Sequence, residues 1–357
     1  MRLNELQSFN TEQEYRDSDS LNYSKLKTMV EDPMMLTKEP KDISGLPAIK
    51  IGSLVDTLLT DAENVDNIFH VGSVKEPTSQ LLELAKYIVD NHISVNDHMF
   101  VDEKNNCLQS KILDKILSIA NELGLWRSVK KEDKRIDKFD TNVFYDYLNY
   151  HIESNGKIVL SNEQRLIGER CAFILSSHDY TKDIICAQSD DRYEVIDQFK
   201  YEFKFNGATC KVMLDKIIVD HEKKIIYPYD IKTGSKSPEK FIENYEYFKY
   251  YIQAQLYLCA MFHIKDKYEF FNNYEVADFK FIYISTKEEY DYPMKYVHRI
   301  DSAEELEYGW TDESGVLHRG IIPLIDEYKW RMLNNTFNIS KKTIDNKGEF
   351  IIKKYSL

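Results

Sequence analysis

The stretch from Val212 to Gly234, VMLDKIIVDHEKKIIYPYDIKTG, predicts a β-hairpin that brings two aspartates together. Both arms are rich in the β-branched, aromatic and other apolar residues that strands favour, and a polar break at 221–224 separates them. If this break is a four-residue turn, Asp215 lies directly opposite Asp230. Directly opposed side chains have Cβ atoms about 4.5–5.5 Å apart, and like charges at this separation destabilise a sheet. The hairpin therefore favours a cation between the two carboxylates.

Lys232 adds an ammonium group, because it follows Asp230 by two residues and alternation along a strand turns both to one face. Carboxylate oxygens bind hard divalent cations, and a bound cation beside an ammonium is suited to phosphodiester hydrolysis. The alternative is an ordinary surface hairpin with solvated or ion-paired charges, since charged residues make up 30% of the chain. The context favours the metal site, because the D-x-K triplet ends a strand and leads through Thr233 and Gly234 towards a helix.

A single long helix is predicted after the hairpin, over residues 239–262. Its start at 237–239 is typical, with serine at the N-cap and proline at the first helical position. One stripe of this helix carries Glu246, Tyr250, Gln253 and Tyr257. Core packing is the ordinary role of such a stripe, and we expect it for Tyr250 more than for Gln253, because a buried glutamine needs hydrogen-bond partners.

These motifs resemble the PD-(D/E)XK nuclease superfamily, specifically its RecB-like branch. The resemblance lies in an upstream aspartate, the D-x-K-T-G strand end and the helical Q-x-x-x-Y, here Gln253 and Tyr257. It implies an α+β (α/β/α-like) fold, in which a mixed central β-sheet is flanked by helices around a restriction-endonuclease-like core. It also implies catalytic roles for Asp215, Asp230, Lys232, Gln253 and Tyr257.

Three further segments resemble exonuclease-VIII-type (RecE-like) phage exonucleases, so that the similarity covers about residues 20–262. They are LNYSKLKTMVEDPMML (21–36), AIKIGSLVDTLLTD (48–61) and LSNEQRLIGERCAFILSSHDYTKDII (160–185). In that family a helical histidine binds metal, and Asp56 holds its position here. The resemblance implies that one or two Mg²⁺ ions, for which Mn²⁺ can substitute, are held by Asp56, Asp215, Asp230 and the carbonyl of Ile231. Asp56 could equally be a polar residue on the exposed side of an amphipathic helix.

The resemblance also implies a substrate and partners. We expect hydrolysis of linear double-stranded DNA from a free end, in phage-type recombination or DNA processing, beside a single-strand annealing protein and in a homo-oligomeric ring. Two other functions stay open. One is a nuclease of the same superfamily that acts on branched or single-stranded DNA, and the other is a non-catalytic DNA-binding or assembly module that keeps the fold.

The net charge of −13 is unusual for a DNA-binding protein, because phosphate contacts come from Lys and Arg. The densest basic segment is 127–135, and basic pairs recur at 341–342 and 353–354. Lys236, Lys240 and Lys249 follow the D-x-K strand directly, and we expect these three to bind the DNA backbone. Such basic runs are more often solvated helix surfaces, and this interpretation is the alternative.

The five cysteines form no C-x-x-C pair and none follows Cys259, which predicts reduced thiols and no iron–sulphur cluster. No apolar run approaches the roughly 18 residues of a membrane span, and residues 1–20 lack the apolar region of a signal peptide. We therefore expect a cytoplasmic enzyme, in a bacterial host cell, that makes no membrane contact.

The chain is expected to have three parts. Residues 1–20 form a flexible segment, residues 21–300 form the nuclease domain with a helical insertion at 76–186, and residues 301–357 form a C-terminal helix and tail. Within the sheet Pro228 has no N–H to donate, so it predicts an edge strand, a bulge or a slip of the hairpin register.

Overall fold

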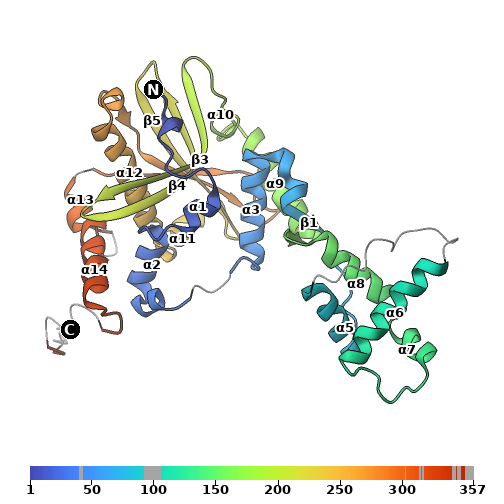
Figure 1. The fold of residues 1–357 in the computed structure, drawn as a ribbon. Helices are drawn as coiled ribbons and strands as arrows, with labels where there is room; N and C mark the ends of the chain where they lie inside the picture. Colours follow the sequence, from blue (N-terminus) through green and yellow to red (C-terminus); the bar gives the residue numbers. More distant parts are fainter. Residues whose placement is uncertain are drawn as a thin grey trace, which may run out of the picture. The chain divides into compact units, whose positions relative to one another are not determined.

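The computed structural model describes residues 1–39, 43–91, 106–301, 303–312, 315, 317–339, 343 and 347–349 (Figure 1). They belong to two compact units, Met1–Thr60 with Ile167–Leu357, and Asp61–Leu166. Helices and strands are mixed along the chain, and a mixed central sheet is flanked by helices, so the predicted α+β class is confirmed. The basic pairs 341–342 and 353–354 lie outside the described residues.

The first unit is built on a six-stranded sheet. Its strands are β3 (Tyr193–Phe205), β4 (Ala208–Asp220), β5 (Ile225–Gly234), β6 (Glu275–Val276), β7 (Phe279–Ser285) and β8 (Met294–His298). The order is β3–β4–β5–β7–β8, with β6 also paired to β5. Neighbouring strands are antiparallel, except that β5 runs parallel to β6 and β7. The sheet is therefore an antiparallel meander extended by a parallel crossover.

The β4–β5 hairpin has the register predicted from the sequence. Lys216 pairs with Tyr229 and Asp220 pairs with Ile225, which leaves residues 221–224 as the turn. The ladder ends at the Lys216–Tyr229 pair. The two aspartates of the candidate site are the next residue on each strand, and they lie where β4 and β5 separate.

Pro228 does not mark an edge strand or a slip in register, so two of the three expectations were wrong. The third, a bulge, agrees with the partner segment, which has one residue more than β5 between the Ile226–Val276 and Tyr229–Lys280 pairs. Pro228 pairs with Ile217 inside the sheet, and β5 has neighbours on both sides. On the other side, β5 pairs with β6 only up to Ile226 and with β7 only from Tyr229 onward. Pro228 lies in the gap between these two ladders, where no backbone N–H is required.

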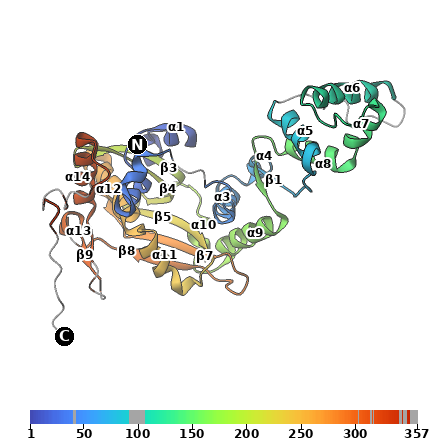
Figure 2. The same cartoon turned by 90° about the horizontal axis from the view of Figure 1, so that it is seen from below.

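Helices cover both faces of the sheet, as Figure 2 shows for α12 (Tyr250–Lys267) on one side and α3 (Pro47–Thr60) on the other. The face towards α12 buries a large core that includes Phe199, Leu214, Ile217, Ile252 and Leu256. The opposite face packs on α3 and on α9 (Asn162–Ser177), and its core includes Val55, Cys171, Leu175, Ile218 and Ile282. Because both faces are covered, the polar groups at the end of β5 are enclosed by α3 and α12.

The first twenty residues, expected to be a flexible segment, form η1 (Leu3–Leu6) and α1 (Glu12–Asp17). Thr11 begins α1 with a capping box, and Leu3 and Tyr15 are buried. The backbone amide of Leu3 donates to the Glu194 carboxylate on β3. The Lys211 ammonium on β4 donates to the Tyr15 carbonyl and lies 4.6 Å from the centroid of the Tyr15 ring. These contacts attach the segment to the sheet.

The helix predicted over 239–262 is interrupted, so the prediction of one continuous helix was wrong. The structure has η4 (Pro238–Lys240), α11 (Phe241–Tyr247) and then α12, and Lys249 before α12 has a left-handed backbone with φ 57°. Glu246 therefore does not share a helix with Tyr250. The interruption allows the rings of Phe241 and Tyr250 to stack with their centroids 5.8 Å apart, a packing gain that a straight helix would lose.

The other elements of the first unit support this sheet. Tyr23–Glu31 (α2) and Pro33–Thr37 (η2) precede α3, Lys182–Ile185 (α10) follows α9, and Glu269–Phe271 (η5) follows α12. Ala303–Tyr308 (α13), Trp310–Thr311 (β9), Leu317–His318 (β10) and Ile321–Asn334 (α14) come after the sheet. None of the helices in the described ranges is long and apolar enough to cross a membrane. Cys171, Cys210 and Cys259 are free and buried, and Cys186 is free and exposed.

The second unit is mainly helical. It contains η3 (Ala62–Asn64), α4 (Val65–Ile68), β1 (Phe69–Val71), α5 (Ser79–Asp90), α6 (Asn106–Glu122), α7 (Glu132–Phe139), α8 (Asn142–Glu153) and β2 (Ile158–Leu160). Leu84, Ile88, Ile116, Phe139 and Phe144 are part of its own core. The unit differs from the expected insertion at 76–186, because β1 and β2 pair in parallel and because Cys171 and Leu175 of α9 pack on the sheet of the first unit.

The turn of the β4–β5 hairpin is stabilised by Asp220. Arg192 donates to its carboxylate from Nε at 3.1 Å and from Nη2 at 2.7 Å, and the amides of Glu222 and Lys223 donate to it as well. The hydrogen bonds from Arg192 are the main reason that the pKa of Asp220 is lowered to about 2. A lowered carboxyl pKa stabilises the fold above the unfolded pKa of about 4, and this stabilisation is lost as the pH falls through about 2.

We expect Asp220→Asn to lower the free energy of unfolding at neutral pH by about 1–3 kcal/mol, because charged hydrogen bonds are lost. The difference from the parent should shrink as the pH falls from about 4 towards about 2, where the parent carboxylate is also protonated. Urea unfolding of both proteins across this pH range measures the effect. A difference that stays constant with pH would contradict the assignment of the stabilisation to the ionised Asp220.

Candidate functional site

Asp230 and Lys232 form an ion pair at the end of β5. Asp230 Oδ2 lies 2.5 Å from Lys232 Nζ, and Asp230 is only 1% exposed. Gln253 on α12 donates from Nε2 to the other oxygen, Asp230 Oδ1, at 2.7 Å. The Asp230 carboxylate thus links the end of β5 to the first turn of α12, with Lys232 on one oxygen and Gln253 on the other. The sequence analysis expected such a partner for a buried glutamine.

Asp215 lies beside this pair, where β4 and β5 separate. Its Oδ2 accepts a hydrogen bond from the Ile231 amide at 2.7 Å. Burial, followed by the charges of Asp230 and Asp56, raises the pKa of Asp215 well above its usual value. Burial also raises the pKa of Asp230, although Lys232 and Gln253 oppose the shift. The charge of Asp230 thus adds to the shift at Asp215, whereas hydrogen bonding with Asp215 lowers the pKa of Asp230.

Asp56 reaches the same group from α3. Burial raises its pKa to about 7, while the charge of Lys232 lowers it and that of Asp230 raises it. One turn earlier, a Cβ added to Gly52 would stand 3.4 Å from Thr233 Oγ1, so α3 lies directly against the end of β5. Asp56 is half-buried and electrostatically coupled to the sheet residues, so the structure does not place it on an exposed helix face.

Lys232 lies between a carboxylate and an aromatic ring. Its Nζ is 5.0 Å from the centroid of the Tyr250 ring, in a cation–π contact. Burial disfavours its charged form, but the carboxylates of Asp230 and Asp215 raise its pKa well above the usual value. The ammonium is therefore held in its charged form.

Two tyrosines of this environment were not assigned to the site from the sequence. Tyr250 was expected to be a core residue, yet its ring faces the Lys232 ammonium. Tyr23 on α2 donates its hydroxyl to the carbonyl of Phe248, and its ring centroid is 6.3 Å from that of Tyr250. Tyr23 lies in segment 21–36, which carries part of the family resemblance. That resemblance is the sequence feature from which a position near the site could have been predicted.

Tyr257 has a more enclosed position than Gln253. It is 6% exposed, and its ring contacts Phe279 of β7 edge to face, with the centroids 5.8 Å apart. Burial raises the pKa of its hydroxyl well above the usual value, and Tyr15 and Asp230 add to the shift. The structure therefore places Tyr257 in the core behind the carboxylates, where it packs α12 against the sheet.

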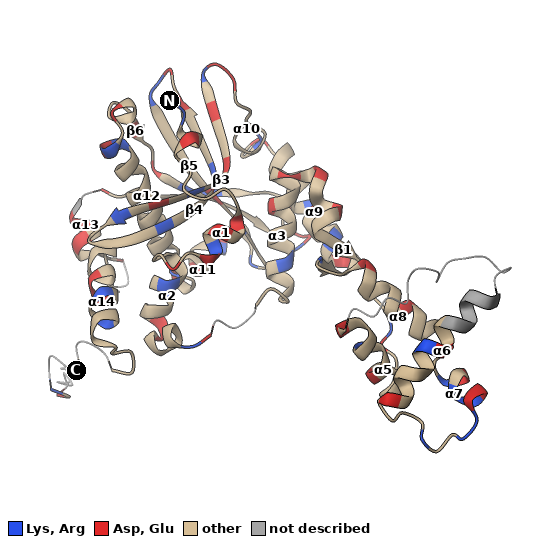
Figure 3. Ribbon diagram, viewed as in Figure 1, with Lys and Arg blue, Asp and Glu red and all other residues tan. Residues whose placement is uncertain are grey.

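The three lysines expected to bind the DNA backbone follow β5, but two of them have local partners. Lys236 forms an ion pair with Glu243, with Nζ and Oε2 2.7 Å apart, and Lys249 donates from Nζ to the Glu246 carbonyl. Lys240 is exposed. Figure 3 shows acidic and basic residues mixed along the helices.

Asp56, Asp215 and Asp230 all interact electrostatically with Lys232, so the group is negatively charged when all four are ionised. In the part of the chain that the structure describes, no three His, Cys, Asp or Glu side chains converge as a ready-made metal site. The donors that fit a hard divalent cation are the two sheet aspartates, whose repulsion a cation would relieve. Within the same described part, the buried Gln253 Oε1 accepts no hydrogen bond.

Comparison with known proteins gives little further information. No family model and no curated protein matches the chain. Among solved structures, a protein from Eubacterium rectale that is provisionally named an exonuclease aligns with 100% of this chain and 97% of its own. The sequence identity is 11% and the TM-score is 0.38. At this TM-score the alignment does not establish a shared fold or function.

Proposed function

We propose that this protein is a metal-dependent nuclease that hydrolyses phosphodiester bonds in DNA. The observation that carries the proposal is the joined group of Asp230, Lys232 and Gln253, with Asp215 hydrogen-bonded to the adjacent Ile231 amide. These residues come from two strands and one helix, and their mutual contacts fix their positions. An isolated surface hairpin would not need a buried glutamine to hold its aspartate.

The charge of the site supports a divalent cation. A negatively charged group would repel a phosphodiester unless a cation reversed its charge. Asp215, Asp230 and the carbonyl of Ile231 would hold Mg²⁺ or Mn²⁺, and Asp56 would complete the set from α3. When bound, the ion would supply Lewis-acid stabilisation of the charge that develops on the phosphate.

The protein's own residues would supply the other functions. Lys232 would orient the attacking water or offset negative charge on the phosphate, because its ammonium is already held beside Asp230. Gln253 would keep the Asp230 carboxylate in one orientation through the 2.7 Å hydrogen bond. Tyr250 would restrict the position of the ammonium from the opposite side. Tyr257 would support α12 from the core.

The substrate proposal follows the sequence resemblance. It is linear double-stranded DNA degraded from a free end, with Lys236, Lys240 and Lys249 along the DNA backbone. A single-strand annealing protein as partner and a homo-oligomeric ring belong to the same proposal. Of this group, Lys240 is exposed, whereas Lys236 and Lys249 are half-buried.

We expect Mg²⁺ or Mn²⁺ to support cleavage of DNA, and Ca²⁺ or excess EDTA to suppress it, because Ca²⁺ takes longer bonds and looser geometry. The measurement is a timed digestion of end-labelled linear DNA and of closed-circular DNA with each ion. Full activity in excess EDTA would contradict a metal-dependent reaction.

The same digestion separates the alternatives. Cleavage of linear but not circular duplex supports an end-dependent exonuclease. Cleavage of branched or single-stranded DNA alone supports a structure-specific or single-strand nuclease. DNA binding without cleavage under any ion supports a non-catalytic DNA-binding or assembly module.

A further inference from the structure

Gln198 has an unusual backbone conformation in the middle of strand β3. Its φ is +52°, in the left-handed region that residues other than glycine rarely adopt. The residues around it are paired normally, since Asp197 pairs with Lys216 and Phe199 pairs with Leu214. Gln198 and Asp215 are the residues left between these two pairs. The unusual backbone therefore lies directly across the β3–β4 ladder from a residue of the candidate site.

The alternation of side chains changes at this point in both strands. Residues on one face of a strand are normally two apart. In β3 the core on the α12 side contains Ile196 and then Phe199, Tyr201 and Phe203. In β4 the same core contains Cys210, Val212 and Leu214, and then Ile217 and Val219. In each strand, two successive core residues are therefore three apart instead of two, across Gln198 in β3 and across Asp215 in β4. This spacing indicates one extra residue in each strand.

The opposite face confirms that the alternation shifts. Tyr193 and Val195 of β3 pack with Ile218 of β4 in the core on the α3 side. Beyond Gln198, the odd-numbered residues of β3 move to the core on the α12 side, as Phe199 shows. Because both strands shift together, their register is the same before and after. A β-bulge, with one extra residue in one strand, redirects side chains and is common beside functional sites. Here the two extra residues lie opposite each other, and we call this pair the matched bulge.

The bulge determines where Asp215 can point. At an extra residue the regular alternation no longer assigns the side chain to either core. The Asp215 carboxylate instead reaches past the end of the β4–β5 ladder and accepts the Ile231 amide at 2.7 Å. Asp230 lies on the α12 side of β5, since it alternates with Ile226 and contacts Gln253 of α12. If β4 kept the alternation of Cys210, Val212 and Leu214, Asp215 would point to the α3 side, away from Asp230.

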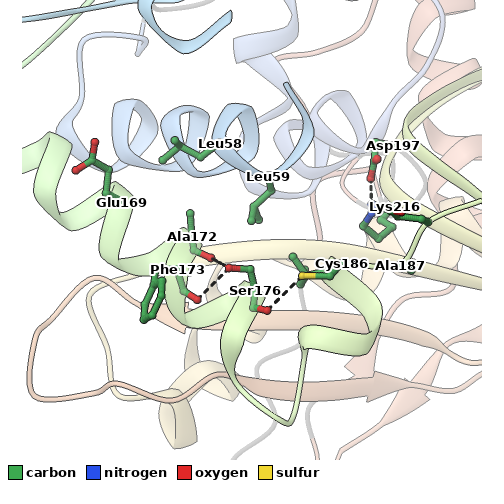
Figure 4. Close-up of a pocket in the computed structure, with 12 residues that line it drawn as sticks. Leu58, Leu59, Glu169, Ala172, Phe173, Ser176, Cys186, Ala187, Asp197 and Lys216 are labelled. Carbon is green, nitrogen blue, oxygen red and sulfur yellow. Dashed lines mark hydrogen bonds and ion pairs between the residues drawn. The ribbon is translucent and has the colours of Figure 1, made fainter. Parts of the chain in front are cut away.

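Contacts on both sides hold the bulge in place. On one side Asp197 and Lys216 form an ion pair, with Oδ1 and Nζ 2.6 Å apart, beside a pocket of about 500 Å³ that Figure 4 shows. On the other side the Lys200 ammonium donates to the carbonyl of Gln198 at 3.0 Å, and the Lys200 amide donates to the side chain of Gln7. The first twenty residues thus contribute to the support of the bulge.

We propose that Gln198 is a positioning residue, whose left-handed backbone forms the bulge that directs the Asp215 carboxylate into the candidate active site. The proposal adds a positioning residue to the proposed function, and it rests on that function because it takes Asp215 to be a cation ligand. Its structural part concerns only the contact between Asp215 and Ile231. This part is measurable without any metal ion or DNA.

The test compares Gln198→Gly with Gln198→Val in the full-length protein. Glycine adopts the left-handed region freely, whereas a β-branched valine strongly disfavours it. Without divalent ions, hydrogen exchange at the Ile231 amide should match the parent in Gln198→Gly and be faster in Gln198→Val. Titration with Mn²⁺ should show about 10–100-fold weaker binding in Gln198→Val, and DNA cleavage should fall by about a hundredfold. Gln198→Ala should be intermediate, and it replaces the valine variant if that variant does not fold.

Asn335→Val is the matched control, because Asn335 is also left-handed, with φ 47°, but lies at the C-cap of α14. It should lower stability without changing exchange at Ile231 or binding of Mn²⁺. Parent-like exchange at Ile231 and parent-like Mn²⁺ binding in a folded Gln198→Val or Gln198→Ala would overturn the proposal. If the parent neither binds Mn²⁺ nor cleaves DNA, yet exchange at Ile231 still separates Gly from Val, the proposed function fails while the positioning role of Gln198 stands.

Discussion

Lys232→Ala is expected to reduce the cleavage of linear DNA by at least about a hundredfold, because it removes the ammonium that lies beside the scissile position in our proposal. The structure holds this ammonium 2.5 Å from Asp230 Oδ2 and 5.0 Å from the centroid of the Tyr250 ring. DNA affinity should change little, because one lysine adds little to a footprint of many phosphate contacts. Single-turnover cleavage and equilibrium DNA binding, measured on the same preparation, separate these two effects.

The variant should also be less stable, since it leaves the buried Asp230 carboxylate without its cation. Thermal unfolding of each preparation is therefore required before the rates are compared. Lys182→Ala is the matched control, because Lys182 pairs with Asp179 at the surface and has no part in the proposed site. It should retain the parent rate. A folded Lys232→Ala protein that keeps most of the activity would rule out the D-x-K assignment and favour a structural hairpin.

Asp215→Asn is expected to abolish cleavage and, in the absence of divalent ions, to raise the thermal stability of the protein. Burial and the charges of Asp230 and Asp56 raise the pKa of Asp215, so its ionised form is unfavourable in the folded state. Asparagine removes that charge, and its side-chain oxygen can still accept the Ile231 amide. A residue that costs stability but is required for activity is typical of a functional site. Calorimetry in EDTA and cleavage assays in Mg²⁺ measure the two effects.

Asp197→Asn provides a control with the opposite sign. Asp197 is the partner of the buried Lys216, so its neutralisation leaves a buried ammonium without a counter-ion and should lower stability. A decrease in the melting temperature of Asp215→Asn similar to that of Asp197→Asn would mean that Asp215 is a stabilising residue. In that case the repulsion between the two sheet aspartates would not be the source of cation binding.

The hairpin at the centre of the candidate site could be predicted because its determinants are local. The turn at 221–224 and the apolar arms on either side fix the register, and the Lys216–Tyr229 pair has the predicted alignment. Alternation along β5 then puts Lys232 beside Asp230. Gln253 was assigned to the site by the family resemblance, and the rule that a buried amide needs a partner agrees with its hydrogen bond to Asp230. The hairpin itself needs only neighbouring residues in the sequence.

Other features depended on contacts between distant residues, and local rules did not predict them. Lys249 takes a left-handed backbone that ends the predicted helix, because aromatic stacking of Phe241 on Tyr250 requires a turn between them. Pro228 is tolerated inside the sheet, because the parallel ladders to β6 and β7 leave a gap at its position. In both cases the local preference of the residue is outweighed by packing that only the folded chain provides.

The sequence by itself therefore determined the pairing of β4 with β5 and the identity of the charged residues at the end of β5. Only the tertiary structure decided the direction in which Asp215 points, since the matched bulge at Gln198 interrupts the alternation from which side-chain directions are inferred. It also decided that Tyr250 faces Lys232 and that Asp56 reaches the sheet from α3. The charged groups at the end of β5 are neighbours in the sequence, so local rules predict them. The helices and strands that surround these groups and shift their pKa values are distant in the sequence, and they come together only when their apolar faces are buried.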